Sequence, residues 1–325
     1  MNSLVPSPGS DASHGLQRFD QKIARDFIYK TISEETRAAY SRTIRDFFIF
    51  VRGVHPCHVT TAHGIAYRDQ LRSLGRKAAT VATKLAILSA FFEYLRVAGV
   101  ITLNPLSPKL VKPPQRPRAP SGRSLTPKEV RYLLSGPDRA KPSGARDYAL
   151  MLLMLRLALR ITEASTLRTS AIRWSHGRWI LRCKVKGGGE ETWPLPKDVK
   201  AAIDHYLKLD LERRQTLHTD ADDSFLFQPV VNHRTLVYDK PLGQRWIQKT
   251  IHRWAAYTGI GHVTPHDLRR SVVTKLLDDG NSYREAQMVT KHKSVNTLMK
   301  YDYGRENLDK NPVNSLSWDD TPMLN

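Results

Sequence analysis

The chain has 325 residues, enough for about two domains that each bury a core of their own. With 40% hydrophobic and 25% charged residues, its composition is globular and excludes wholesale disorder. The 51 Lys and Arg residues against 31 Asp and Glu residues give a net charge of +20, which indicates a polyanionic partner, most often nucleic acid. A membrane is the weaker alternative, because the longest apolar run, Tyr148 to Leu155, is far shorter than the ~20 residues that a membrane span needs.

Neither the N-terminus nor the cysteines suggest export. Residues 1–17 contain no basic start and no apolar stretch, so we predict a disordered tail and not a secretory signal, and a cytoplasmic protein. Cys57 and Cys183 lie far apart and outside any metal-ligand spacing, which argues against a disulfide or a zinc site. We expect both to be buried as small hydrophobic side chains. Three acids within residues 220–223 stand in a polar loop, where carboxylates are usually solvated, so we predict no metal site.

Residues 18–100 have the periodicity of a small helical bundle. Apolar residues recur on one face over residues 40–51 and again over residues 81–95, which predicts two amphipathic helices that pack together. A shorter helix is indicated by Tyr67, Leu71 and Leu74. The polar faces of these helices carry more basic residues than acidic ones.

Residues 101–124 hold six prolines and five basic residues but no acidic residue. Proline-rich chain is extended and semi-rigid, so this segment is predicted to be a linker whose positive charge suits phosphates; a solvated spacer is the alternative. The basic residues that we expect to bind DNA, in the bundle and in this linker, are Arg42, Arg45, Arg76, Lys77, Lys84, Lys109, Lys112 and Arg116.

Residues 125–310 are predicted to form a second domain, followed by a C-terminal tail over residues 311–325. Its first helix begins at Thr126 to Glu129, a capping box with proline at the first helical position. Alternation from Arg178 to Lys186, a run of three glycines and a short second strand predict a β-hairpin with Lys186 at its tip. Further helices are predicted over residues 147–159, 199–210 and 244–257.

Another helix is predicted to begin at Thr264, which caps it together with Asp267. His266 and Arg269 lie three residues apart in its first turns and share a face. Because a helix N-terminus offers free N–H groups and partial positive charge, this pair suits a phosphate. Taken alone, the pair fits a structural His beside a surface Arg more readily.

Four stretches then follow in order within about 150 residues: LRITEASTL, the basic hairpin, PHDLRR and HKSVNTLMKY. Together they resemble the tyrosine recombinase (phage integrase) family. In that family an Arg follows a buried helix, a Lys lies on a β-hairpin, an HxLR sequence opens a helix, and a His precedes the nucleophilic Tyr by nine residues. The resemblance places the catalytic roles on Arg160, Lys186, His266, Arg269, His292 and Tyr301.

The chemistry of these residue types agrees with the resemblance. Attack on a phosphodiester builds negative charge on its non-bridging oxygens, and two guanidiniums, Arg160 and Arg269, can hold those oxygens in bidentate fashion. His266 can donate to the phosphate or accept the phenolic proton, and His292 can complete the charge clamp. Neighbouring cations favour the phenolate, which a lone tyrosine with a pKa near 10 does not readily form.

Lys186 is expected to protonate the leaving 5′ oxygen. For three of these catalytic roles a nearby residue of the same type is an alternative: Tyr303 for Tyr301, Arg156 for Arg160 and Lys184 for Lys186.

Three positions near these residues depart from the family pattern. Ala158 and Lys291 stand where the family usually has glycine, and Thr162 stands where it usually has serine. None of these departures removes a catalytic group, and Lys291 bears on the turn that precedes His292.

The resemblance implies a mainly α protein with a small antiparallel β-sheet, built from a helical SAM-like core-binding domain and a tyrosine-recombinase catalytic domain. It implies a site-specific DNA recombinase or integrase that cuts and rejoins duplex DNA through a covalent 3′-phosphotyrosine, without a cofactor or a metal. It also implies a homotetramer on paired sites, a monomer or weak oligomer when free, and a nucleoid-associated location. The apolar residues that we expect to dock the tail on a neighbouring subunit are Leu308, Leu316 and Trp318.

The alternatives are a type IB topoisomerase, a non-catalytic DNA-binding regulator and a metal-dependent transposase. The target sequence stays open, as does the choice between phage integration, mobile-element movement and dimer resolution.

Overall fold

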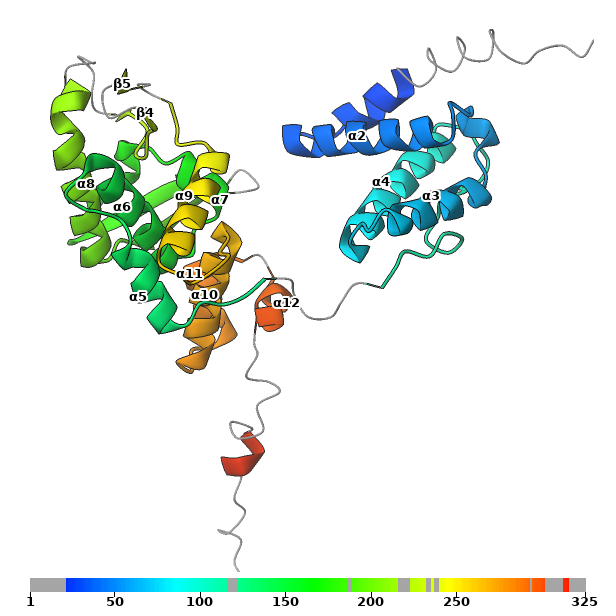
Figure 1. Ribbon diagram of the computed structural model, residues 1–325. Helices are drawn as coiled ribbons and strands as arrows, with labels where there is room; N and C mark the ends of the chain where they lie inside the picture. Colours follow the sequence, from blue (N-terminus) through cyan, green and yellow to red (C-terminus); the bar gives the residue numbers. More distant parts are fainter. Residues whose placement is uncertain are drawn as a thin grey trace, which may run out of the picture. The chain divides into compact units, whose positions relative to one another are not determined.

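The computed structural model describes residues 22–115, 122–185, 189–215, 223–231, 235–236, 240–292, 294–301 and 312–315. The chain divides into two compact units, Met1–Arg118 and Ala119–Asn325 (Figure 1).

The N-terminal unit is a helical bundle, as its periodicity predicts. It comprises a helix over residues 22–29, α2 (Glu34–Phe50), the 3₁₀ turn η1 (Pro56–His58), α3 (Thr61–Ser73) and α4 (Ala78–Val97). Ser33 caps α2 by accepting a hydrogen bond from the N–H of Thr36. Leu74, expected on the apolar face of the third helix, is instead 62% exposed, because it follows the last residue of α3.

Aromatic rings fill the core of this unit. Phe27, Phe47, Phe91 and Phe92 are each at most 1% exposed, and Phe47 packs edge-on against Tyr67 with ring centroids 5.2 Å apart. Helix α4 is long and apolar enough to pass a length and composition test for a membrane span. Its apolar side chains, however, supply much of this core.

The predicted linker over residues 101–124 begins too early, because its first part belongs to the N-terminal unit. Leu106 and Val111 are each 2% exposed and pack against the helices. The Asn104 side chain donates to a backbone carbonyl of α4 and accepts from the Leu106 N–H. Gly64 of α3 allows this close packing, since a Cβ there would lie 2.9 Å from Val111. The many prolines of this segment suggested an extended linker, so the sequence did not predict that Leu106 and Val111 are buried.

The C-terminal unit is mainly helical with a small antiparallel sheet, as expected. Helix α6 (Pro142–Leu157) is central and packs against α8 (Lys197–Gln215) and α10 (Pro265–Asp278) (Figure 1). The other helices are α5 (Pro127–Ser135), α7 (Ile161–Ser165), α9 (Gln244–Tyr257), α11 (Tyr283–Thr290) and α12 (Val295–Leu298). The 3₁₀ turns are η2 (Thr169–Ala171), η4 (Met299–Tyr301) and η7 (Pro312–Ser315).

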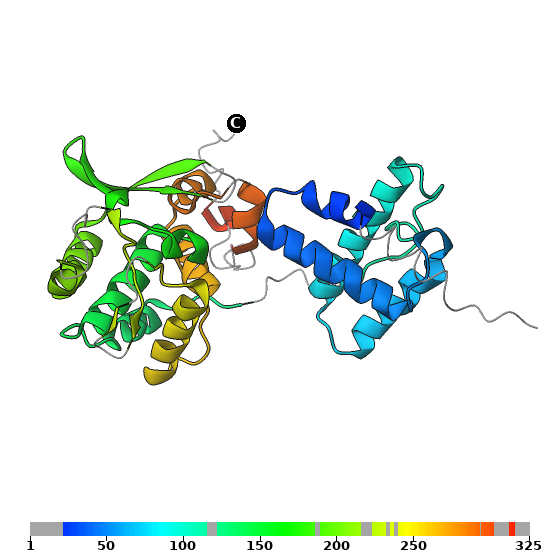
Figure 2. The same cartoon turned by 90° about the horizontal axis from the view of Figure 1, so that it is seen from above.

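The sheet has the strand order β1 (Ile172–Ser175), β2 (Arg178–Lys184) and β3 (Glu190–Pro194), and it lies along one side of the unit (Figure 2). Lys184 pairs with Glu190, and the Val185 N–H donates to the Gly189 carbonyl, so β2 and β3 form the predicted hairpin. Strand β1 is too short for its alternation to be recognised. A second sheet pairs β4 (Val230–Val231) with β5 (Thr235–Leu236).

The cysteines differ from the prediction in part. Both are free, but Cys57 is exposed in the η1 turn and only Cys183 is half-buried. Within the described ranges, no group of three or more His, Cys, Asp or Glu residues is arranged to hold a metal ion. Of the three acids in residues 220–223, only Asp223 lies in the described part, where it accepts a hydrogen bond from Ser170.

Candidate active site

Arg269 lies at the centre of the site and ties three segments together. It stands in the first turns of α10, whose N-terminus is capped by Thr264 and Asp267 as predicted. Its side chain is only 4% exposed, and it donates to the carbonyls of Ala158 and Thr290 and, over 3.1 Å, to Nε2 of His292. Burial, followed by the charge of Arg160, lowers the pKa of Arg269 to about 10, so the guanidinium stays charged at neutral pH.

Two left-handed residues shape the turns around Arg269. Ala158 ends α6 with φ 51° and Lys291 ends α11 with φ 52°, a conformation that costs a residue with a Cβ about 1–2 kcal/mol. Both stand where the family usually has glycine, and both nevertheless keep a left-handed backbone. Lys291 lies beside the hairpin, since its Nζ is 3.2 Å from Glu191 and its charge stands over the ring of Trp193.

The protonation of His292 follows from its hydrogen bonds. Arginine can only donate, so Nε2 of His292 accepts from Arg269 and carries no proton. Nδ1 lies 2.7 Å from the Thr290 hydroxyl, which itself donates to the Ala286 carbonyl, so Nδ1 is the protonated nitrogen. Burial, then Arg269, Arg160 and His266, lower the pKa of His292 to about 3. Here the imidazole is neutral and orients Arg269.

Arg160 is held but remains accessible. At the start of α7, its N–H and its guanidinium donate to the two carboxylate oxygens of Glu163, at 2.7 and 2.8 Å. Glu163 is 2% exposed, whereas the Arg160 side chain is 30% exposed, so part of the guanidinium faces solvent. The rival Arg156 is half-exposed and pairs with Asp198 of α8, away from these contacts. The geometry therefore favours Arg160.

Tyr301 contacts the same group of side chains. Its hydroxyl lies 3.1 Å from Nε2 of His266, and its ring centroid is 6.2 Å from that of His266 and 6.3 Å from that of His292. Although His266 is exposed as a residue, burial of its ring is the largest cause that lowers its pKa, followed by the charge of Arg270. The neutral imidazole can accept the phenolic proton.

Arg270 is the residue that the sequence analysis missed. It is 1% exposed, and its guanidinium lies 5.2 Å from the centre of the Tyr301 ring. A signal was available, because Arg270 follows His266 by four residues and helical periodicity places both on one face.

The described residues leave two of the predicted catalytic assignments undecided. Lys186, at the hairpin tip, and Tyr303, the reserve nucleophile, lie outside them. Lys184 is described: it is exposed at the end of β2 and lines a pocket of about 320 Å³ with Arg168, Arg173 and Arg182.

Most of the predicted DNA-binding residues are exposed on the N-terminal unit. These are Arg42 and Arg45 on α2, Arg76 and Lys77 before α4, and Lys109 and Lys112 after it. Lys84 differs, because it is half-buried and its Nζ lies 2.7 Å from the Asp46 carboxylate. Arg116 is outside the described residues.

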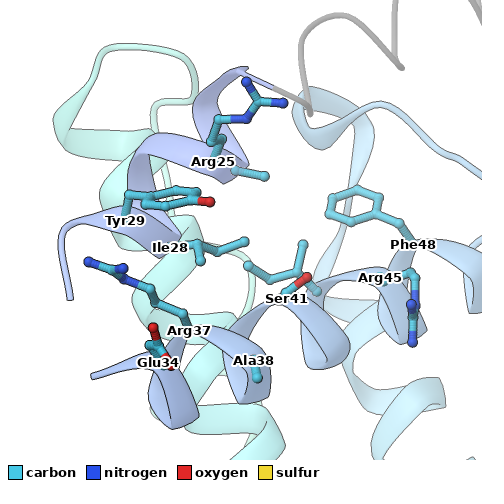
Figure 3. Close-up of a pocket in the computed structure, with 11 residues that line it drawn as sticks. Arg25, Ile28, Tyr29, Glu34, Arg37, Ala38, Ser41, Arg45 and Phe48 are labelled. Carbon is cyan, nitrogen blue, oxygen red and sulfur yellow. The ribbon is translucent and has the colours of Figure 1, made fainter. Parts of the chain in front are cut away.

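Arg45 also borders a groove of about 950 Å³ between the helix over residues 22–29 and α2. Figure 3 shows Ile28 and Phe48 toward its inside, with Arg25, Arg37 and Arg45 around its edge. The arginines around this groove add to the positive charge of the unit.

Comparison with known proteins identifies the family of both units. The model of the phage integrase family matches residues 123–306, and the model of the phage integrase N-terminal SAM-like domain matches residues 16–97. Tyrosine recombinase XerD of Listeria monocytogenes serotype 4b (strain F2365) is 28% identical over 86% of this chain and 93% of its own length. Tyrosine recombinase XerD of Xanthomonas axonopodis pv. citri (strain 306) is 30% identical over 71% of this chain and 74% of its own.

Solved structures share the fold. A lambda integrase dimer bound to a COC' core site matches 90% of this chain and 77% of its own, with a TM-score of 0.65 and 19% identity. A lambda integrase tetramer bound to a Holliday junction matches 88% of this chain and 76% of its own, with a TM-score of 0.64 and 18% identity. These matches confirm the predicted combination of a helical N-terminal domain and a catalytic domain.

Proposed function

We propose that Tyr301 is the nucleophile of this chain, which belongs to the phage integrase family and is a tyrosine-type site-specific DNA recombinase. The observation that carries the proposal is the gathering of Arg269, His266 and His292 around one phenol. The Tyr301 oxygen attacks a DNA phosphorus, the bond to the 5′ oxygen breaks, and a 3′-phosphotyrosine forms. The 5′ hydroxyl of a partner strand later reverses the exchange.

Each side chain has a distinct part in this step. Arg160 and Arg269 bind the non-bridging oxygens, on which negative charge develops. His266 takes the phenolic proton as the new bond forms, because its Nε2 is the group at the hydroxyl. His292 holds Arg269 in place through its neutral Nε2. Lys186 on the hairpin protonates the leaving 5′ oxygen.

The exchange requires no metal and no ATP, since one phosphoester bond is replaced by another of similar energy. Incubation with a DNA site nicked to trap the cleaved strand, in EDTA, tests this directly. Wild-type protein is expected to form a covalent protein–DNA adduct, and Tyr301→Phe is expected to form none. The matched control is Tyr257→Phe, which alters an exposed tyrosine of α9 and should leave the adduct unchanged.

An adduct that persists in Tyr301→Phe would overturn the assignment, as would an adduct that forms only when a divalent metal is added. Relaxation of plasmids of any sequence would favour the type IB topoisomerase alternative, because a site-specific recombinase cuts only at its own sites.

The tetramer on paired sites is part of the same proposal, since exchange of two duplexes needs four active sites. The lambda integrase tetramer on a Holliday junction supports it through the shared fold. We infer that Leu308, Leu316 and Trp318, which lie outside the described residues, dock on a neighbouring catalytic unit. An apolar groove of about 780 Å³, lined by Leu134, Leu152, Leu155, Val272 and Leu276, is a suitable receptor.

Removal of residues 311–325 should abolish pairing of two sites and leave binding to one site intact. Replacement of Leu134 in the groove by Asp should have the same effect. Unchanged recombination in both variants would reject this docking. We expect the protein to act in the cytoplasm and to associate with the nucleoid, since its substrate is duplex DNA.

A further inference from the structure

A short strap at the start of the C-terminal unit lies along α10. The backbone N–H of Arg123 donates to Oδ1 of Asp267 over 3.0 Å. The N–H of Leu125 donates to the Ser271 hydroxyl over 2.7 Å. The hydroxyl groups of Ser124 and Thr274 lie 2.8 Å apart. The strap, residues 122–125, is therefore hydrogen-bonded to three positions along α10, the first of them in the same turn as His266.

The Arg123 side chain fixes the strap from its other side. It donates to the Ile260 carbonyl over 2.8 Å and lies 2.9 Å from the Glu129 carboxylate. The strap follows directly on residues 116–121, the segment that joins the two units. It is therefore the first described part of the C-terminal unit after the linker.

Gly122 shows how closely the strap approaches α10. Its φ is +110°, a value that L side chains rarely adopt, and an added Cβ would lie 2.6 Å from Oδ1 of Asp267. The same Cβ would lie 3.3 Å from the guanidinium of Arg270. A side chain at position 122 must therefore displace Asp267, Arg270 or the strap itself.

Asp267 and Arg270 connect the strap with the nucleophile. Asp267 is 4% exposed, and although burial opposes ionisation, hydrogen bonds from Thr264 and the Arg123 N–H lower its pKa, as does the charge of Arg270. The carboxylate is therefore anionic beside the guanidinium. On its other side Arg270 faces Tyr301, with 5.2 Å between the guanidinium and the ring centre. The strap therefore donates to the Asp267 carboxylate, the charges of Asp267 and Arg270 interact, and Arg270 lies against the Tyr301 ring.

We propose that Arg270 is a positioning residue for Tyr301 and that the strap controls it through Asp267, so that the path of the interdomain linker sets how readily the phenol reacts. This rests on the proposed role of Tyr301 as nucleophile. A fixed guanidinium against the ring orients the phenol for attack. A change in the linker that moves the strap acts on Asp267, to which the Arg123 N–H donates, and through the charge of Asp267 on Arg270.

Other charged and titratable groups also face Tyr301. They are His266 and Arg269 on α10, His292 after α11 and, through its effect on Arg269, the Arg160–Glu163 pair of α7. Arg270 differs from all of these, because its guanidinium would also lie 3.3 Å from a Cβ added at Gly122 of the strap.

The first test measures the rate of covalent adduct formation on the nicked site at saturating DNA, together with the affinity for that DNA. Arg270→Gln removes the guanidinium that lies against the Tyr301 ring, so the rate should fall by about tenfold while the affinity stays unchanged. Arg270→Lys, which keeps the charge, should restore part of the rate. Arg146→Gln is the matched control, since Arg146 is also buried but pairs with Asp147 and contacts none of these groups.

The second test acts on the strap itself. Gly122→Ala should slow adduct formation at saturating DNA and leave the affinity for DNA unchanged. Gly259→Ala is the control, because Gly259 has a similar positive φ of +72° but open space around it. It should alter thermal stability without altering the adduct rate.

The inference is overturned if Arg270→Gln lowers thermal stability while the adduct rate at saturating DNA stays unchanged, or if Gly122→Ala behaves like Gly259→Ala. If Arg270→Gln does not fold, the Gly122→Ala result decides. These outcomes are separable from failure of the proposed function, in which wild-type protein forms no adduct or Tyr301→Phe retains it.

Discussion

The two units differ in what they bury. Among the described residues of the N-terminal unit, Thr43 is the one buried polar side chain, and the interior is otherwise aromatic and aliphatic. The C-terminal unit buries Glu163, Arg269, Arg270 and His292 together at the candidate site. Burial of charge is costly unless each group is paired or hydrogen-bonded, so such a cluster indicates a preorganised site. Charge carried on a surface, as on the N-terminal unit, suits contact with phosphates.

The largest effect is expected in the apolar interior. Phe47→Ala removes a fully buried ring and should lower the free energy of unfolding of the N-terminal unit by about 3–5 kcal/mol, as measured by urea denaturation. Ile49→Ala is the control, because Ile49 is 69% exposed on the same helix and its loss should have little effect. Similar losses in both variants would show that the unit is not held by this core.

The next effect distinguishes a bidentate contact between the Arg160 guanidinium and the phosphate from the effect of its positive charge alone. Arg160→Lys keeps the positive charge but loses the planar fork, so adduct formation should slow by about 10²–10³-fold. Arg156→Lys, four residues earlier in α6 and paired with Asp198, should leave the rate unchanged. A rate for Arg160→Lys near that of wild type would exclude a bidentate contact to the phosphate.

The free energy of unfolding of the C-terminal unit, which buries the charged and titratable groups, should depend on pH. His292 has a folded pKa of about 3 against about 6.5 when unfolded, and His266 is shifted in the same direction. The unfolded state therefore binds more protons below pH 6.5, and stability that is complete above that pH is lost as the pH falls toward 3. Denaturation of the C-terminal unit between pH 7 and pH 4 should show this slope.

His292→Gln should flatten that slope, whereas His176→Asn, at an exposed turn, should leave it unchanged. Equal slopes in wild type and His292→Gln would contradict a buried neutral imidazole.

A smaller effect is expected at the left-handed turn before His292. Lys291→Gly should be more stable than Lys291→Ala by about 1 kcal/mol, because only the Ala variant carries a Cβ at φ 52°. The order should reverse at Met288, an exposed position inside α11, where Gly is the poorer helix former. Thermal denaturation of the four variants checks this, and the same order at both positions would argue against a left-handed residue 291.

The smallest effect concerns the surface of the N-terminal unit. Arg42→Ala should reduce the slope of log affinity for DNA against log salt concentration by about 1, since the exposed guanidinium displaces a counterion. Lys84→Ala should change that slope less, because Lys84 is already paired with Asp46. A larger change for Lys84 would mean that the pair opens on DNA.

Local signals in the sequence predicted much of this structure. The capping residues Thr126 and Thr264 marked helix starts, and α9 has the predicted bounds, because caps and periodicity act within one helix. The candidate site followed from spacing and the family resemblance. Features that depend on tertiary packing were not predicted. These are the burial of Leu106 and Val111 against the helices of the N-terminal unit, and the position of Arg270 against the Tyr301 ring.

The role of His292 as a hydrogen-bond acceptor was not predicted either, because it depends on a hydrogen bond from Arg269, which lies twenty-three residues away in sequence.

The central claim is that one phenol, Tyr301, takes the 3′ phosphate of DNA within this cluster. Protease digestion of the adduct trapped on the nicked site, followed by mass spectrometry of the DNA-linked peptide, tests it most directly. The account predicts a single modified residue, Tyr301, joined to a 3′-phosphate end. A link to any other residue, including Tyr303, or to a 5′ phosphate would contradict it.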